Sequence, residues 1–358
     1  MKVVIVTSLE RGGPLDHAVS LAGGLVKLGA EVSAVCAGRA AAERFHRQGA
    51  RPLVAPLRHQ LDAWGATRVL RLTRGADVVH AQDRRSGLWT RLMPRRRGGP
   101  RRVYTFHGLP DPYLPEQAGL PGPSLRDRLA YERLDGALAR RSDAVIVPSQ
   151  YMARVVEERL HFPAAKLAVV PNGVEASAAV AGGRLVGTVS VLEPVKALDV
   201  FLRAAARVGE HDKDARFACF GDGSARERLV ELAASLGLAQ RMSFPGHVPV
   251  QDALGELRVF ALCSWMENSP MALMQAMAVG LPTVATNVGG VPEIADGVAE
   301  LVPAGDADAL AAALQRIMRD DALAARLGAA GRVRVQQRFT AERNARDVLT
   351  VYERVLSR

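Results

Sequence analysis

The chain has 358 residues, of which 48% are hydrophobic and 23% charged, and its formal net charge at pH 7 is +10. This length predicts two domains of about 150 to 180 residues each, because a single hydrophobic core rarely grows further. The three cysteines (Cys36, Cys219 and Cys263) show no CxxC spacing, so neither a disulfide framework nor a zinc site is indicated. The apolar run at the N-terminus is too short for a signal sequence, and no 18 apolar residues run together. We therefore expect a cytoplasmic protein that is soluble or at most peripheral to a membrane.

Apolar runs alternate with helical patterns along the first half of the chain. Residues 2–6, KVVIV, form a continuous apolar run typical of a buried parallel strand, and apolar residues at helical spacing follow from Leu15 to Val26. Further strands are predicted at AEVSAVC (30–36), DVVHA (77–81), RVYTFHG (102–108), DAVIVPS (143–149) and LAVVPNG (167–173). This alternation predicts a doubly wound parallel sheet.

The second half repeats the architecture without repeating the sequence. Strands are predicted at RLVGTVSVL (184–192), ARFACFGDG (215–223), RMSFPGH (241–247), VFALCS (259–264), PTVAT (282–286) and AELVPAG (299–305), with helical patterns between several of them. We expect an N-terminal Rossmann-like domain over 1–175, a linker over 176–184 and a C-terminal Rossmann-like domain over 185–340. The last segment, 341–358, is predicted as a helix that packs back on the N-terminal domain.

Three segments depart from this rhythm. Residues 94–102, PRRRGGPRR, form a basic loop, and residues 108–123 are too rich in Gly and Pro for regular structure. Residues 124–141, SLRDRLAYERLDGALARR, predict one helix with leucines on roughly one side and arginines elsewhere. An ordinary amphipathic surface helix is the favoured interpretation, and a weak contact with an anionic membrane is the alternative. Both 108–123 and 124–141 are candidates for shaping an acceptor site.

Open parallel sheets bind ligands outside the carboxyl ends of their strands, so the strand-to-helix turns are where a site is expected. In the first turn, Gly12 and Gly13 let the backbone approach a ligand, and the helix that follows directs its N-terminal dipole at it. His107 ends another strand on the same rim. Either feature alone also fits a structural role.

Lysine is rare in this chain and occurs only at Lys2, Lys27, Lys166, Lys196 and Lys213. Lys196 follows the strand at 184–192 and stands just before a predicted helix, where its ammonium group is able to reach a phosphate oxygen. The alternative is an ordinary surface lysine. Since either role places Lys196 on an exposed loop, we expect it to contribute little to the fold, so that Lys196→Ala leaves the melting temperature nearly unchanged. The rarity of lysine favours the functional interpretation.

The densest group of polar and small residues lies in 264–293, SWMENSPMALMQAMAVGLPTVATNVGGVPE. Ser269 and Pro270 predict a helix start, with the serine as the cap and the proline at the first helical position. The N–H groups of Met271 to Leu273 then suit an anion. Glu267 stands just before this turn, where a carboxylate is expected to accept hydrogen bonds from hydroxyl groups.

These motifs resemble the retaining glycosyltransferases of family 4, which have the GT-B fold of two facing Rossmann-like domains with a cleft between them. The resemblance covers nearly the whole chain: GGP, FHG, DAVIVPS, VVPNGV, VSVLEPVKALD, FGDGSARERL and the block from Glu267 to Glu293. That block is the most specific part, because in the family it is a glutamate, seven residues, a second glutamate, then AMA, a variable residue, G, a variable residue and P.

The resemblance implies an enzyme that moves a hexosyl-type sugar from a nucleotide diphosphate sugar, most readily a UDP- or GDP-sugar, to an acceptor hydroxyl. In this scheme the diphosphate lies at Lys196 and the first helical amides, Glu267 holds sugar hydroxyls, position 275 the ribose, and the base lies near Gly221 and 246–248. The implied catalytic residues are His107, Lys196 and Glu267. The implied donor-binding residues are Gly12, Gly13, Val191, Gly221, Val248, Ser269, Met271, Ala272, Leu273 and Gln275.

The family's chemistry further implies front-face substitution, in which the leaving diphosphate helps to deprotonate the acceptor and no enzyme nucleophile is required. Catalysis then depends on orientation and on stabilisation of the departing diphosphate. We expect no cofactor, since the nucleotide sugar is a co-substrate, and no metal, since the sequence has no acidic cluster of metal-binding type.

The chain departs from the family pattern at three positions. Val191 replaces the arginine that shares the diphosphate with the lysine, Ala197 replaces a glycine, which we expect to be a mild change, and Gln275 replaces the second glutamate. Charge-assisted hydrogen bonds contribute about 1.5–3 kcal/mol against about 1 kcal/mol for neutral ones. These losses put activity in doubt, so the alternative is a degenerate member that binds a nucleotide sugar or a partner without efficient turnover.

A third hypothesis is a basic module that binds nucleic acid or a membrane. The aromatic content of 5% leaves no stacking platform for bases, so we expect no nucleic acid partner. Base identity, donor sugar, acceptor class and oligomeric state stay open at this point.

Overall fold

The structure is a computed structural model that describes residues 1–59, 62–95, 97–109, 122–179 and 182–358. By its contacts the chain divides into two compact units. The first comprises Met1–Gly108, Pro123–Glu175 and Thr340–Arg358. The second comprises Ala176–Phe339 and the short segment Leu109–Gly122, of which 110–121 lie outside the described residues. Most of the Gly- and Pro-rich segment considered for the acceptor site is therefore not described.

The first unit contains a sheet in the order β3-β2-β1-β4-β5-β6-β7, and each neighbouring pair is parallel. Its strands are β1 (Lys2–Val6), β2 (Glu31–Cys36), β3 (Arg51–Val54), β4 (Val78–Ala81), β5 (Arg101–Thr105), β6 (Ala144–Val147) and β7 (Leu167–Val169). Its helices are α1 (Gly13–Lys27), α2 (Arg39–Arg47), α3 (Ala63–Leu72), α4 (Arg84–Leu92), α5 (Leu125–Asp127), the π-helix η3 (Arg128–Leu134), α6 (Asp135–Arg141), α7 (Gln150–Leu160), the short η4 (Ala164–Lys166) and α15 (Ala341–Leu356).

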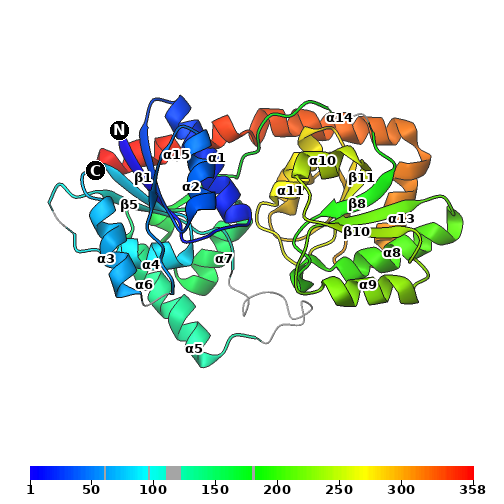
Figure 1. Cartoon of the computed structure of the whole chain (residues 1–358), viewed down its shortest axis with the longest axis horizontal. Helices are drawn as coiled ribbons and strands as arrows, with labels where there is room; N and C mark the ends of the chain where they lie inside the picture. The colour runs from blue at the N-terminus through cyan, green and yellow to red at the C-terminus, as the bar shows by residue number, and fades with distance from the viewer. Residues whose placement is uncertain (60–61, 96, 110–121, 180–181) are drawn as a thin grey trace. The chain divides into compact units, whose positions relative to one another are not determined.

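Strand β1 shows why this sheet needs helices on both faces. Val3 and Ile5 join a buried cluster with α1 and α15, whereas Val4 and Val6 join a second cluster with α3. Successive side chains of a strand point to opposite faces, so a continuous apolar run is stable only when both faces are covered. Figure 1 shows the helices on either side of the strands.

Helix α15 is part of the first unit although it ends the chain. The chain enters it through a bridge between Val174 and Thr340, and Asn344 donates a hydrogen bond to Pro171 O at 2.7 Å. Ala345 lies so close to Gly24 of α1 that a Cβ there would come within 2.5 Å of it. The last helix therefore packs tightly against α1.

The sequence analysis did not predict β3, and it described residues 124–141 as one regular helix. β3 is a short edge strand that contains Pro52, which fits only where a backbone donor is not needed for a further strand. In 124–141 the π-helix η3 interrupts the α-helical turns. Leu125, Leu129 and Leu134 are exposed, while Leu138 is buried, so most of the predicted apolar side is not covered by the described residues.

The second unit contains a parallel sheet in the order β10-β9-β8-β11-β12-β13. Its strands are β8 (Leu185–Val189), β9 (Arg216–Phe220), β10 (Met242–Gly246), β11 (Leu257–Leu262), β12 (Thr283–Thr286) and β13 (Glu300–Val302). Its helices are the short η5 (Pro194–Lys196), α8 (Leu198–His211), α9 (Arg226–Ser235), α10 (Val250–Gly255), α11 (Met271–Ala278), α12 (Val291–Ala295), α13 (Ala307–Arg319) and α14 (Asp321–Arg338).

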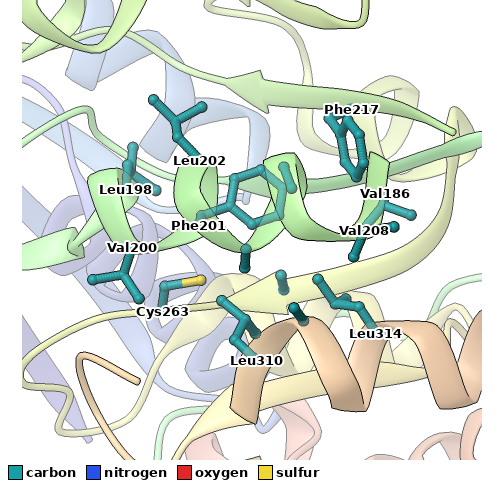
Figure 2. Close-up of a cluster of buried hydrophobic side chains, with 14 of the residues drawn as sticks. Val186, Leu198, Val200, Phe201, Leu202, Val208, Phe217, Cys263, Leu310 and Leu314 are labelled. Atoms are coloured by element: carbon teal, nitrogen blue, oxygen red, sulfur yellow. The ribbon is translucent and has the colours of Figure 1, made fainter. Parts of the chain in front are cut away.

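The core of the second unit forms where α8 and α13 pack against β8, β9 and β11. Phe201 and Val208 of α8 lie against Phe217 of β9, and Leu310 and Leu314 of α13 complete the cluster (Figure 2). Burying a phenylalanine or leucine side chain contributes about 1.5–3 kcal/mol, so this cluster fixes α8 on the sheet. The loop that precedes α8 is thereby held in place.

Across both units, no helix in the described ranges is long and apolar enough to cross a membrane.

Candidate active site

The loop between β8 and α8 carries Lys196 on a tightly turned backbone. Residues Pro194–Lys196 form one 3-10 turn, and Lys196 N donates to Glu193 O at 2.9 Å. Ala197 then adopts φ 48° and ψ 41°, in the left-handed region, before α8 begins. This conformation costs a residue with a Cβ about 1–2 kcal/mol. We had expected the change from glycine to alanine to be mild, and the backbone shows that it is not. Lys196 is held by a loop that pays this cost.

The side chain of Lys196 is largely buried, so the expectation of an exposed loop lysine that contributes little to the fold is wrong. Its Nζ lies 2.6 Å from Glu267 Oε1, and the same oxygen accepts a hydrogen bond from Ser264 Oγ at 2.6 Å. The side chains of Lys196 and Glu267 are 21% and 10% exposed. The structure therefore joins two residues that the sequence separates by 71 positions, and it adds Ser264, which the sequence analysis did not single out.

Glu267 is also fixed through its backbone by the glycine turn after β12. Gly290 N donates to Glu267 O at 2.9 Å. Gly289 has φ 55°, and a Cβ at this position would lie 1.9 Å from Glu267 O. Only glycine fits here, because both the positive φ and the close approach exclude a side chain. The NVGG motif thus fixes the backbone of Glu267.

Helix α11 begins directly after this carboxylate. Its N-cap is Pro270 and its first residue is Met271, so the predicted capping position of Ser269 is one residue too early. Pro270 has no side-chain acceptor, and the first hydrogen bond of the helix runs from Met274 N to Pro270 O at 3.2 Å. The N–H groups of Met271, Ala272 and Leu273 precede that bond, which is the usual arrangement for binding an anion. Ser269 itself is buried.

Gln275 lies further along α11 and is half-buried. No described contact joins it to Lys196 or Glu267. Its position within the helix is consistent with the predicted role toward the ribose and does not test it.

The residues expected near the base come together beside the Lys196 loop. Gly221 N donates to Gly246 O at 2.7 Å, and a Cβ on Gly221, which has φ 128°, would lie 1.9 Å from Ser190 O. Val191 is the next residue and is 52% exposed. Val248 is half-buried two residues after Gly246. The structure thus brings the β8, β9 and β10 ends of the predicted donor site into contact.

In the first unit, Gly12 is the N-cap of α1 and has φ 98°. Its carbonyl accepts from the N–H groups of Leu15 and Asp16. A Cβ at either Gly12 or Gly13 would meet no atom within 4 Å, so the backbone requires glycine only at position 12 and the space above both is open.

His107 belongs to a buried network that the sequence analysis largely missed. Its Nε2 lies 3.1 Å from Gln82 Oε1, and its ring meets the edge of His17 with the centroids 5.0 Å apart. Gln82 Nε2 also contacts His80. The clue was in the sequence: polar residues end the strand in DVVHAQD, where an apolar strand alone would need none.

The network continues to the last helix of the chain. His80 Nδ1 lies 2.6 Å from Tyr352 Oη on α15, and His80 Nε2 lies 2.7 Å from Thr105 Oγ1. The contacts therefore run from α15 through His80 and Gln82 to His107.

Burial keeps these histidines neutral. It lowers the pKa of His17 to about 4 and that of His80 to about 3, with a smaller contribution from His17 to the latter. The pKa of His107 lies well below its usual value, chiefly because of burial and secondarily because of His17 and His80. With Gln82 Oε1 as the acceptor, the neutral His107 carries its proton on Nε2 and its lone pair on Nδ1. His107 is thus suited to hydrogen bonding and not to supplying a positive charge.

Two family models match the chain. One, described as Glycosyltransferase Family 4, matches residues 11–178, and the other, described as Glycosyl transferases group 1, matches residues 183–320. Both units are thereby covered.

Among curated proteins, the chain is similar to D-inositol 3-phosphate glycosyltransferase of Stackebrandtia nassauensis, with 28% identity over 79% of this chain and 69% of that protein. It is 33% identical to the putative colanic acid biosynthesis glycosyltransferase WcaL of Salmonella typhimurium, over 51% of this chain and 50% of the relative. The chain covers half or less of the length of several further relatives.

Solved structures share the fold over nearly the whole chain. HepE of Anabaena in complex with UDP-glucose has a TM-score of 0.80 at 17% identity, covering 100% of this chain and 98% of that one. Sucrose-phosphate synthase from Thermosynechococcus elongatus has a TM-score of 0.81 at 19% identity, covering 99% of both chains. At such identities the likeness shows the fold, and it confirms the predicted fold class.

Proposed function

The chain belongs to glycosyltransferase family 4 and is an enzyme that transfers sugars, and from this premise we propose that it is a retaining, metal-independent glycosyltransferase that moves a hexosyl-type sugar from a UDP-sugar to an acceptor hydroxyl. The observation that carries the proposal is the contact of Lys196 with Glu267 immediately before the N-terminus of α11. A cation, a hydroxyl-binding carboxylate and a row of amides are the groups that a sugar diphosphate requires. The expected cytoplasmic location stays a prediction.

The choice of UDP over GDP is supported by a structural neighbour. HepE of Anabaena has been solved with UDP, with UDP and glucose, and with UDP-glucose. Its fold matches this chain from end to end, so a UDP-sugar is the first donor to test.

In the proposed mechanism the diphosphate lies against Lys196 and the amides of Met271, Ala272 and Leu273. An ammonium group has three donors, so Lys196 is able to keep its bond to Glu267 while it donates to a phosphate oxygen. As the bond from the sugar to the diphosphate breaks, negative charge grows on the leaving oxygens, and these fixed donors stabilise it. These directed donors are the reason for proposing that no metal ion is needed.

The remaining residues have positioning roles. Glu267 accepts hydrogen bonds from donor-sugar hydroxyls, and Gln275 holds the ribose. The base lies near Gly221 and Val248. Because the pKa of His107 is lowered by burial, this residue is proposed to hydrogen-bond the donor sugar as a neutral imidazole. The leaving diphosphate, and not a side chain, helps to take the acceptor proton in a front-face substitution.

The direct test is a thermal-shift panel with UDP-, GDP-, ADP- and dTDP-sugars, followed by an assay of nucleotide release. A ligand at 100 times its Kd stabilises the folded state by about 2.7 kcal/mol, so even a weak donor registers at millimolar concentration. We expect a shift with a UDP-sugar, and a product with the anomeric configuration of the donor by NMR.

The matched control is Lys213→Ala, which removes an exposed lysine from the same unit. Lys196→Ala should abolish transfer and Lys213→Ala should not. Donor binding without turnover on any acceptor or water would favour the degenerate alternative, and wild-type turnover in Lys196→Ala would remove the assignment.

A further inference from the structure

The first unit has a cavity at the amino ends of its strands, whereas Gly12 and His107 lie at the carboxyl ends. The cavity measures about 360 Å³ and is lined by residues at the C-terminal ends of α3 and α4 and at the start of β5. In a doubly wound sheet the helices run antiparallel to the strands, so helix ends and strand starts meet at the amino edge. Gly12 and His107 follow the carboxyl ends of β1 and β5. The cavity is therefore separate from the site described above.

Positive charge dominates the cavity lining. Five arginines line it, and Asp143 is the only acidic residue among the described lining residues. The arginines are Arg71, Arg74, Arg95, Arg101 and Arg102. Several come from the basic loop PRRRGGPRR, to which the proposed function gives no role.

Part of this charge has a structural explanation. Arg102 Nη1 donates to Arg91 O at 3.2 Å, and Arg95 Nη2 donates to Arg141 O at 2.8 Å, so both satisfy carbonyls near helix C-termini. Asp143 accepts from Arg95 at 3.4 Å and lies 3.9 Å from Arg101. One carboxylate therefore faces the guanidinium groups of Arg95 and Arg101, and its other oxygen accepts from the backbone N–H of Arg102.

Burial is the main reason that the pKa of Arg102 is lowered. The positive charges of Arg95 and Arg141 lower it further, whereas Asp143 raises it.

Arg71 and Arg74 have no such explanation. They are exposed at the end of α3, three positions apart, and neither side chain has a hydrogen bond or ion pair within the described part of the chain. A positive charge near a helix C-terminus stabilises the helix by about 0.3–1 kcal/mol. That preference does not explain why three further arginines line the same cavity. Arg71 and Arg74 are exposed, whereas Arg102, which also lines the cavity, is buried.

We propose that this cavity binds a phosphate group, either of a soluble phosphorylated ligand or of a phospholipid headgroup. Arginine presents a planar fork that matches phosphate oxygens in pairs, and Arg71 and Arg74 supply two such forks that make no hydrogen bond or ion pair with the described residues. The volume falls in the range of small-molecule sites. Leu70 and Met93 also line the cavity and suit the carbon skeleton attached to the phosphate.

The test compares three full-length proteins: the wild type, Arg71→Gln/Arg74→Gln, and the control Arg68→Gln/Arg159→Gln. Both double variants lose two exposed arginines and the same net charge, but Arg68 and Arg159 lie outside the cavity lining. One arm titrates glycerol 3-phosphate by calorimetry, and the other sediments the protein with vesicles of phosphatidylglycerol or of phosphatidylcholine. Phosphate binding elsewhere is common to all three proteins and cancels in the comparison.

We expect binding in one arm to weaken at least tenfold in Arg71→Gln/Arg74→Gln and to stay within twofold of the wild type in the control. Loss in the calorimetry arm identifies a soluble ligand, and loss confined to phosphatidylglycerol vesicles identifies a headgroup. Equal binding by all three proteins, equal losses in both double variants, or no binding of either probe by the wild type would overturn the proposal. Unchanged melting temperatures confirm that the variants fold.

Discussion

Replacement of Lys196 by alanine should destabilise the second unit even without a ligand. A lysine exposed on a loop would contribute almost nothing to the fold, whereas the Nζ of Lys196 lies 2.6 Å from the largely buried carboxylate of Glu267. Removing it leaves that carboxylate with Ser264 Oγ as its remaining described side-chain donor. The stability change therefore measures the contact on which the proposed site depends.

The magnitude follows from the burial of the pair. A hydrogen bond to a charged group contributes about 1.5–3 kcal/mol, and breaking a fully buried ion pair costs about 3–5 kcal/mol. Because Lys196 is 21% exposed and Ser264 still donates to Glu267, the lower range applies, and we expect about 2 kcal/mol. For a unit of this size, 1 kcal/mol shifts Tm by about 2–4 °C, so the expected fall is about 4–8 °C.

The assay is scanning calorimetry of Lys196→Ala, Glu267→Gln, the double variant and Lys213→Ala. The two single variants should not add, because each removes the same contact, and the coupling energy from the cycle should be about 1–2 kcal/mol. Lys213→Ala should melt with the wild type. If Lys196→Ala melts within 1 °C of Lys213→Ala, or if the two single effects add, the pair does not stabilise the unit and the reasoning fails.

Three further predictions concern neighbouring groups. Gly289→Ala should lower Tm and weaken UDP binding at least tenfold. In the control Gly297→Ala, position 297 has φ 73° and the added Cβ meets no atom within 4 Å, so only the backbone cost of about 1–2 kcal/mol is expected. Equal effects of the two substitutions would mean that the close approach of Gly289 to Glu267 O is unimportant. Val191→Arg should tighten UDP binding about tenfold or more by adding a charge-assisted bond, as measured by calorimetry, and a loss of affinity would show that the pocket is built around valine. Because burial lowers the pKa of His17 to about 4, proton uptake below pH 6.5 favours the unfolded chain. The contribution of neutral His17 to the free energy of unfolding is complete above pH 6.5 and should fall by up to about 1.4 kcal/mol per pH unit between pH 6.5 and 4. The pH slope of Tm should therefore be smaller in His17→Phe than in the wild type, and an equal slope would contradict the burial argument.

The sequence predicted the strands well because most of them are buried on both faces. A strand such as β1 has to be apolar at every position when helices cover both sides, and a continuous run is easy to recognise. The edge strand β3 gives no such signal, since it is short and contains a proline. The π-helix η3 was also beyond reach, because an apolar period over 125–141 reports a helix but not which turn widens.

The candidate site was predictable as motifs but not as contacts. Lys196 and Glu267 were each recognised from their own surroundings, yet only the fold reveals that they meet. Ser264 and Tyr352 were missed for the same reason, since nothing near them in the sequence indicates the partner across the unit. A local sequence pattern indicates where the backbone conformation requires a particular residue, such as glycine at position 289. It does not indicate which distant residue a side chain will contact in the folded protein.

The contact of Lys196 with Glu267 also bears on the arginine missing at Val191. The two charges cancel, so the described pair offers a diphosphate no net positive charge, and attraction has to come from the directed donors of Lys196 and the amides of α11. With an arginine at 191 the same group would carry one net positive charge. Val191 is half-exposed on the same loop, so an arginine side chain there has room. The loop thus keeps the geometry of a diphosphate site while relying on helix dipoles and hydrogen bonds in place of net charge.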